Sequence, residues 1–469
     1  MVRARGTVKS GHSRDALLIC GALFFFSALA PVLLDAQEEI PPAPAPTVTA
    51  PAPSSTEPAP KPSPPVKERF LVDRFPAEPS IPPVFNLPIG PLGFSAPSSN
   101  YLGARNSMAS LDFLDEDRLL FTFRIPGLLH RDQLNSDDGN ERQIRAVVLS
   151  LPKGTVEAEA TWTVHDRVRY LWPLNNGHFL VRDGNTLFEG DGTLTLKPYL
   201  DFPGPLLWIE LDPEQHFLVT NSDEPAAKDS KSGETPGPAT ASAAVTTDQD
   251  SGASGAPPDL VIRILRHDSG DVMLVSRVRT AVHLPINSVG YLENLRSRGM
   301  EWLLNLRYFT GGSRMLGHVE STCEPDDEFL SEQEILVTTC GPSGESSLVA
   351  VTTAGKTLWE TKAPSTQVWP QLVVAANGSR LAWETLDTSH SIYAYAPMDA
   401  GDVKEQSVTI FDAASGNIAM VSPVSPILDA GGNVAVSPSG RRVALLNAGA
   451  IQVFDLPAPP PVHFANDLP

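Results

Sequence analysis

The chain has few cysteines, an excess of acidic over basic residues, and none of the local motifs that mark common catalytic sites. Its 469 residues include three cysteines, and 35 basic residues stand against 55 acidic ones, for a net charge of −20. Such a charge repels a phosphate polymer, which argues against a nucleic-acid partner. His-Glu-x-x-His, Gly-x-Ser-x-Gly, Walker and Gly-x-Gly-x-x-Gly motifs do not occur. The sequence therefore predicts no catalytic residue, no cofactor site and no metal site.

Helical periodicity is missing as well, and a short strand pattern takes its place. Residues 433–446 read as a strand, a Ser-Gly turn and a second strand, and residues 449–456 add a third. A strongly apolar second strand recurs at roughly 48 residues per repeat, close to a propeller period. Its seven copies are Leu119–Phe123, His178–Val181, His216–Thr220, Met300–Leu306, Glu334–Thr339, Arg380–Glu384 and Arg442–Leu446. The pattern predicts an all-β fold, a seven-bladed β-propeller of four-stranded antiparallel blades over residues 68–457.

Two further segments carry a resemblance to known repeats. Residues 408–418 and 354–360 resemble repeats of bacterial PQQ-like propellers, and the hairpin at 433–446 is similar to a WD-type repeat. The resemblance implies a fold and no activity. Quinone-dependent members of that superfamily carry adjacent cysteines beside the cofactor, and this chain has no Cys-Cys pair. Quinone binding is therefore not expected.

The N-terminal segment has the composition of an export signal. Four basic residues precede an uncharged, mostly apolar run at 16–34, as in a signal peptide or an uncleaved signal anchor. We interpret residues 1–36 as one of these two. Both place the rest of the chain outside the cytoplasm, in the periplasm or secreted, and only the anchor would contact a membrane.

Three low-complexity segments are expected to lie outside the folded core. Residues 37–67 contain eleven prolines and form a Pro-rich disordered linker. Residues 222–258 contain no Leu, Ile, Met or aromatic residue, and we expect a disordered insertion within the third blade. Residues 458–469 form a C-terminal tail.

Cys323 and Cys340 are the two cysteines outside the N-terminal segment, 17 residues apart. In an oxidising compartment we expect them to form a disulfide, which would stabilise the fold by roughly 3 kcal/mol on the chain-entropy model. The alternative is a pair of free thiols.

The last blade has only three strands of its own before Pro457 and the prolines that follow it. A propeller without open edges then needs a fourth strand from elsewhere in the chain. We expect an N-terminal strand to close the ring, with residues 68–75 as the first choice and Val84–Leu87 as the alternative.

Three features could suggest ligand sites, and each has a simpler interpretation. Residues 135–141 faintly resemble a calcium loop, yet a polar hairpin loop fits better. The acidic residues 324–328 are interpreted as a solvated loop between blades. The aromatic residues are assigned to packing between blades: Tyr170, Trp172, Phe179, Trp302, Trp359, Trp369 and Trp383.

Function is predicted from the absence of catalytic motifs together with export and repeats. The leading hypothesis is a non-enzymatic propeller that binds a protein or an envelope component on one face. The alternative is a propeller enzyme of the lactonase or hydrolase type, whose site is assembled from loops at the central channel. Such an enzyme requires several acidic, His or Asn side chains to converge there.

Overall fold

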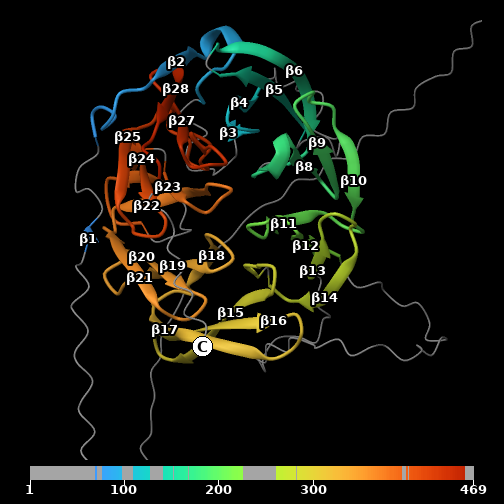
Figure 1. Cartoon of the computed structure of the whole chain (residues 1–469), viewed down its shortest axis with the longest axis vertical. Coiled ribbons are helices and arrows are strands. Elements are labelled where there is room, and N and C mark those ends of the chain that lie inside the picture. Colours follow the sequence, from blue (N-terminus) through green and yellow to red (C-terminus); the bar gives the residue numbers. More distant parts are fainter. Residues whose placement is uncertain are drawn as a thin grey trace, which may run out of the picture. The chain divides into compact units, whose positions relative to one another are not determined.

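The computed structural model describes residues 69–70, 76–97, 109–126, 141–151, 153–166, 168–224, 260–280, 282–392, 398–399 and 401–459. Within Pro64–Pro469 they form seven β-sheets around a common centre (Figure 1). Two 3-10 turns, η1 (Gly90–Leu92) and η5 (Asn175–Gly177), accompany the strands. No α-helix occurs among the described residues. The predicted seven-bladed β-propeller is confirmed.

Six of the seven sheets contain at least four strands. In blades one to three, consecutive strands pair antiparallel. These strands are β3 (Ala109–Phe113), β4 (Arg118–Arg124), β5 (Arg142–Ser150) and β6 (Thr155–Val164) in blade one; β7 (Leu171–Pro173), β8 (Phe179–Asp183), β9 (Thr186–Gly190) and β10 (Lys197–Asp201) in blade two; β11 (Leu206–Leu211), β12 (Phe217–Asp223), β13 (Leu260–Arg266) and β14 (Val272–Val278) in blade three.

The later blades follow the same order along the chain. Their strands are β15 (Gly290–Arg298), β16 (Glu301–Tyr308) and β17 (Ser313–Glu320) in blade four; β18 (Asp326–Phe329), β19 (Glu334–Cys340), β20 (Ser346–Thr352) and β21 (Thr357–Ala363) in blade five; β22 (Gln367–Val374), β23 (Arg380–Thr388), β24 (Val403–Asp412) and β25 (Ile418–Pro423) in blade six; β26 (Val434–Val436), β27 (Arg442–Asn447) and β28 (Ala450–Asp455) in blade seven.

Blade four departs from the predicted four strands, because its sheet has three in the described residues. The extended segment 282–287 precedes them and forms one isolated bridge, between Ile286 and Tyr291. Val282 and His283 line the centre, as the first strands of other blades do. This segment therefore takes the place of an innermost strand without regular pairing. The predicted core Met300–Leu306 falls in β16, the middle strand of the sheet.

The other six predicted second strands match β4, β8, β12, β19, β23 and β27. These strands are apolar because both faces of each blade pack on neighbouring blades. Apolar clusters join every adjacent pair of blades, including blade seven with blade one through Ala435, Ala444 and Leu111. The core is thus a ring of separate interblade layers, which lets one domain exceed the usual size of a single core.

The predicted start of the insertion at Ser222 is wrong. Ser222 and Asp223 belong to β12, where they pair with Val261 and Leu260 of β13. Ser222 is fully buried, and its hydroxyl donates to the buried Glu224 carboxylate. Compositional bias missed these residues because hydrogen bonds, and not apolar area, hold them. Residues 225–259 lie outside the described part.

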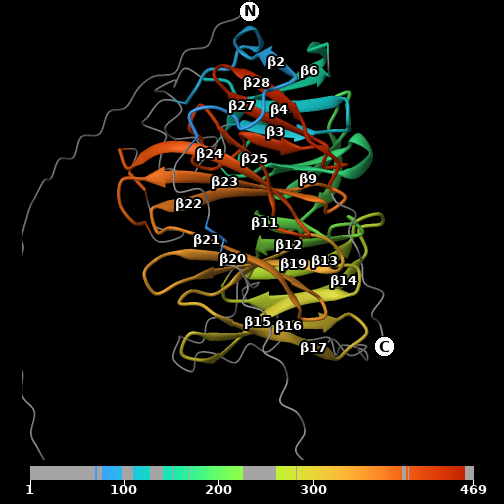
Figure 2. The same ribbon diagram turned by 60° about the vertical axis from the view of Figure 1, so that its left-hand side comes forward.

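Two N-terminal strands pair with the blades, at different places from the first choice made on sequence. β1 (Arg69–Phe70), the described part of residues 68–75, lies parallel to β21 of blade five and not beside β28. β2 (Phe85–Pro88), which overlaps the alternative Val84–Leu87, pairs antiparallel with β28. Figure 2 shows β2 beside β28 and β27. Leu87 of β2 is buried in the apolar cluster between blades seven and one, and closure of the ring by an N-terminal strand stays a prediction.

Several predictions fall outside the described residues: the export segment 1–36, the linker 37–67, and the loop at 135–141 except its last residue. In the part that the structure describes, no helix is long and apolar enough to cross a membrane.

Candidate functional site

The first strands of the blades enclose a central cavity of about 790 Å³. Residues from β3, β7, β11, β18 and β22 line it, and segments 282–283 and 430–432 complete the lining for blades four and seven. In a strand, alternate side chains share a face, so residues two apart project together. Trp208 and Glu210 of β11 form one such pair, and Asp326 and Glu328 of β18 form another.

His283 is held between two carboxylates from different blades. Its Nε2 lies 2.8 Å from Oε2 of Glu210 in blade three, and its Nδ1 lies 2.8 Å from Oδ1 of Asp326 in blade five. Burial lowers the pKa of His283, but the charges and hydrogen bonds of the two carboxylates outweigh burial and raise the pKa well above its usual value. The charged imidazolium is therefore favoured, with an ion pair at each ring nitrogen.

The remaining acidic groups of the cavity resist ionisation. Burial, with the negative charge of Glu210, raises the pKa of Glu328 to about 8. Burial raises the pKa of Asp327 to about 7 and that of Asp112 to about 6, the latter against the hydrogen bond from Ser110 and the charge of Arg169. Ionisable groups with pKa values displaced this far cluster at functional sites.

Aromatic side chains form much of the remaining wall. Trp208 meets the His283 ring edge-on with 5.0 Å between ring centroids, and Trp369 meets Trp383 in the same way at 5.7 Å. The assignment to packing between blades holds for residues in the interblade clusters: Tyr170, Trp172, Phe179, Trp359 and Trp383. Tyr170, Trp172, Trp369 and Trp383 also line the cavity, so packing is only part of their role.

One buried polar side chain at the cavity has no partner. Asn221 of β12 is 1% exposed, and neither Oδ1 nor Nδ2 of its amide makes a hydrogen bond with the protein. It is the register partner of Trp208, so both side chains lie on the same face of the blade-three sheet. Buried amides are nearly always hydrogen-bonded. An unsatisfied amide in the wall of a cavity is a ready contact for a bound molecule.

The interpretation of residues 324–328 as a solvated loop is wrong for its last three members. Asp326–Phe329 is β18, the first strand of blade five, and Asp327 is only 3% exposed. A short acidic strand has the composition of a loop. It pairs with β19 of its own blade. The residues of other blades that it meets at the cavity, such as His283, are distant in the sequence.

No sequence pattern indicates Arg169, Glu210 or His283 as site residues. Each of the three residues stands next to apolar residues in the first segment of its blade. A search for ionisable residues within the first strands would have found Glu210, in the sequence Trp-Ile-Glu-Leu. No local motif marks them because they meet only when the ring closes.

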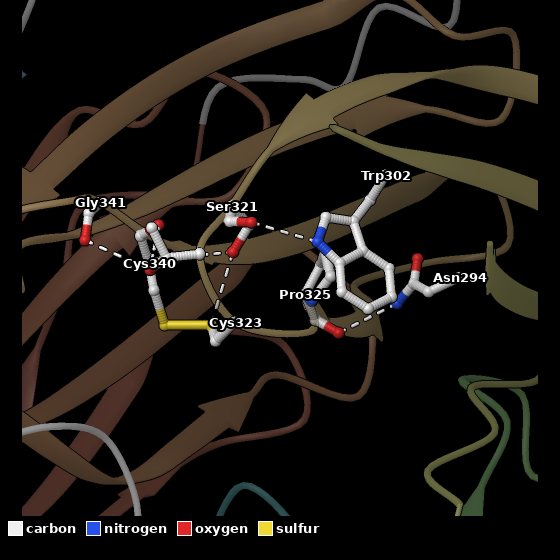
Figure 3. The surroundings of a disulfide bond; sticks show 8 residues. Asn294, Trp302, Ser321, Cys323, Pro325, Cys340 and Gly341 are labelled. Atoms are coloured by element: carbon white, nitrogen blue, oxygen red, sulfur yellow. Dashed lines mark hydrogen bonds between the residues drawn. A yellow bond between two sulfur atoms is a disulfide. The ribbon is translucent and has the colours of Figure 1, made fainter. Parts of the chain in front are cut away.

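The predicted disulfide between Cys323 and Cys340 is present, with 5.6 Å between the Cα atoms. Figure 3 shows it beside Ser321, whose hydroxyl accepts from the Cys340 amide at 3.0 Å and whose carbonyl accepts from the Trp302 indole at 3.1 Å. It joins the segment after β17 to the end of β19, and so ties blade four to blade five.

Across the ranges described, no group of three or more His, Cys, Asp or Glu side chains is arranged to hold a metal ion.

The sequence matches no protein family and no characterised protein. Its fold is similar to that of acylaminoacyl peptidase from Pyrococcus horikoshii, with 10% identity and a TM-score of 0.42 over 72% of this chain and 49% of that one. It is also similar to the β-propeller domain of the Trilobed protease from Pyrococcus furiosus, with 9% identity and a TM-score of 0.43 over 75% and 96% of the two chains. A third similarity is to Chaetomium thermophilum Sqt1 bound to the N-terminus of ribosomal protein L10, with 10% identity and a TM-score of 0.39 over 75% and 97%. The chain spans about half the length of the peptidase. At TM-scores of this size, none of these similarities bears on function.

Proposed function

We propose that this chain is an exported binding module whose partner, a protein or another component of the cell envelope, binds at the central cavity of the propeller. The predicted export segment at 1–36 supports the compartment. The observation that carries the binding site is the convergence of Asp112, Glu210, His283 and Glu328, from four blades, on one cavity. Cavities of this volume with a few convergent polar groups are the usual place for ligands.

The geometry of His283 favours binding over catalysis. A general base needs a nitrogen that can accept a proton, and both nitrogens of this ring are paired with carboxylates. Taking a proton from His283 would break one of the two ion pairs. The residue instead fixes Glu210 and Asp326 in position, which prepares a charged surface for a ligand.

A propeller enzyme of the hydrolase or lactonase type is the second candidate, and Glu328 is the observation that favours it. A carboxyl group with a pKa of about 8 can donate or accept a proton near neutral pH, as general acid–base catalysis requires. Glu328 would be the catalytic acid or base in that case.

Affinity capture from envelope extract with the full chain distinguishes these functions. Its three baits are the natural sequence, the double variant Glu210→Gln/Glu328→Gln, and the control Glu405→Gln, which changes an exposed residue of β24. We expect a partner whose yield falls about tenfold with the double variant, as for a central interface residue, and stays unchanged with the control. Equal yields from all three baits, or no partner from any, would contradict the proposal. Lactone or ester hydrolysis that is lost in Glu328→Gln would favour the enzyme.

A further inference from the structure

We propose that the central cavity binds an alkylammonium group, presented either by a free amine or by a Lys side chain of a partner protein. The inference rests on the proposed binding function and adds the chemistry of the group that enters the cavity.

The charges of the cavity select a cation. Its acidic side chains include Asp112 of blade one, Glu210 of blade three, and Asp326 and Glu328 of blade five, and they outnumber the two basic ones, Arg169 and His283. Ionisation of Glu328 when a cation binds makes the cavity more negative. His283 is already paired with Glu210 and Asp326. In the part of the chain that the structure describes, the carboxyl group of Glu328 makes no hydrogen bond or ion pair, and only the backbone of this residue is paired, with β19. It is the carboxylate left for a ligand.

The aromatic wall suits an ammonium group better than a strongly hydrated metal ion. Organic cations bind over indole faces, with Trp the best partner. Arg169 and Arg182 lie 5.4 and 5.6 Å from the centroid of Trp172, so that ring has cations of the protein itself. Trp208 and Trp369 are half-buried and line the cavity. The His283 ring lies against Trp208, so Trp369 is the indole of the cavity that remains for a ligand. The absence of a metal-holding group among the described residues agrees with this choice.

The buried amide of Asn221 is an independent sign of a ligand. Its Oδ1 has no donor, and an ammonium group carries three N–H donors and no acceptor. Asn221 shares a sheet face with Trp208 and Glu210, so an acceptor, an aromatic ring and a carboxylate lie on one wall of the cavity. An anion would meet the wrong charge there.

Binding should release a proton. In the empty cavity burial raises the pKa of Glu328 to about 8, and the groups that act on it are Glu210 on β11, Asp326 on its own strand, His283 on segment 282–287 and Arg169 before β7. A bound cation favours the ionised carboxylate and lowers that pKa. His283 stays charged because its own pKa is well above the usual value. Affinity should therefore rise with pH toward the pKa of Glu328.

Isothermal titration calorimetry on the full chain tests the inference. The probe for a free amine is 1,5-diaminopentane. The probe for a partner side chain is a Lys peptide acetylated on its α-amino group, so that only the side-chain ammonium is free. The neutral control is 1,5-pentanediol. We expect at least one amine probe to bind, the diol not to bind, and affinity to increase at least about threefold between pH about 6 and pH about 8. Whichever amine binds identifies the source of the group.

Two variants make the result specific. Glu328→Gln should weaken amine binding about tenfold and abolish the proton release, which is seen as equal heats in buffers of different ionisation enthalpy. Trp369→Phe should weaken amine binding severalfold, because a phenyl ring attracts a cation less strongly than an indole ring does. This variant keeps the assay informative if Glu328→Gln does not fold. Glu405→Gln should match the natural protein.

Binding of the diol as tightly as the diamine, no binding of either amine, or unchanged affinity in both variants would overturn the inference. If the amines fail while envelope capture still depends on Glu210 and Glu328, the proposed function stands and only the alkylammonium assignment falls.

Discussion

Nε2 of His283 lies 2.8 Å from Oε2 of Glu210, and this contact ties the irregular inner segment of blade four to the first strand of blade three. Regular strand pairing is missing at that position, where the described segment makes a single isolated bridge. This ion pair and the one between His283 and Asp326 supply part of the stabilisation that hydrogen bonds between strands supply in the other blades.

His283→Gln should therefore destabilise the propeller in a pH-dependent way. A His with a raised pKa contributes stability that is fully present below its unfolded pKa of about 6.5 and is lost as pH rises through the folded pKa. We expect the variant to melt a few degrees below the natural protein at pH about 6 and the gap to narrow at high pH. Differential scanning calorimetry over a pH series measures this. A gap that is constant with pH would contradict it.

Glu384 should also make the natural protein less stable as pH rises, in its case because a neutral carboxyl group is buried. It is fully buried in β23, accepts a hydrogen bond from Gln406 at 2.5 Å, and burial raises its pKa to about 8 against a hydrogen bond from the Gly432 backbone. The folded state keeps a proton that the unfolded state loses, so stability falls as pH rises from about 4 to about 8.

Glu384→Gln removes that dependence while keeping an acceptor for Gln406. We expect the melting temperature of the variant to gain on that of the natural protein from pH about 5 to pH about 8. Glu405→Gln, the exposed control on the adjacent strand, should show no such gain. If the melting temperatures of Glu384→Gln and the natural protein change equally with pH, the prediction that Glu384 is buried as a neutral carboxyl group is wrong.

The disulfide should contribute measurably to stability. Replacing Cys323 and Cys340 by Ser removes a cross-link over 17 residues and should lower the free energy of unfolding by roughly 3 kcal/mol. Urea unfolding of the double variant and of the reduced natural protein should give similar midpoints, both below the oxidised protein. Free alkylation of both thiols in the natural protein, isolated without reductant, would show that the bond does not form.

The corrected boundary of the insertion changes the expected result of deleting it. The Glu224 carboxylate accepts hydrogen bonds from the two terminal nitrogens, Nη1 and Nη2, of Arg263, at 2.6 and 2.8 Å. Deleting residues 226–258 keeps this pair and should hardly change the melting temperature, since closure entropy depends weakly on loop length.

Deleting residues 222–258 removes Glu224 and leaves Arg263 half-buried without it, which should cost a few kcal/mol. Equal thermal stability of the two deletions would show that the end of β12 contributes nothing.

Truncation tests whether the N-terminal strand stabilises the ring. β2 pairs with β28 through Phe85, Asn86, Leu87 and Pro88, and Ile89 joins the apolar cluster of blades seven and one. Truncation to residue 66 should be harmless, whereas truncation to residue 90 should lower the melting temperature and promote aggregation through the open edge of β28. A chain that starts at residue 76 separates the effect of β1 from that of β2. Equal melting temperatures for starts at 66 and 90 would exclude the clasp.

The sequence predicted what depends on local pattern. Second strands such as β4 and β27 are continuous apolar segments because neighbouring blades cover both faces, and this makes the repeat countable. The Cys323–Cys340 bond could be predicted because no other cysteine competes for it outside the N-terminal segment. First strands mix apolar and ionisable residues, since one side faces the cavity, and they resemble loops.

The candidate site could not be predicted for the same reason. Glu210, His283 and Asp326 have no fixed spacing in the sequence. Only ring closure brings His283 to 2.8 Å from a carboxylate oxygen of Glu210 and to 2.8 Å from one of Asp326. The choice between residues 68–75 and Val84–Leu87 as partner of β28 likewise depended on burial of Leu87, which composition does not reveal.

Hydrogen–deuterium exchange with and without the captured partner tests the central claim most directly, because it locates the binding site. We expect slower exchange at residues 282–283, at residues 430–432 and in β18, all at the cavity. The outer strand β14 exposes Val272, Met273 and Val275 and is the competing surface. Slower exchange confined to β14 and its neighbours, with no change at the cavity, would contradict the account.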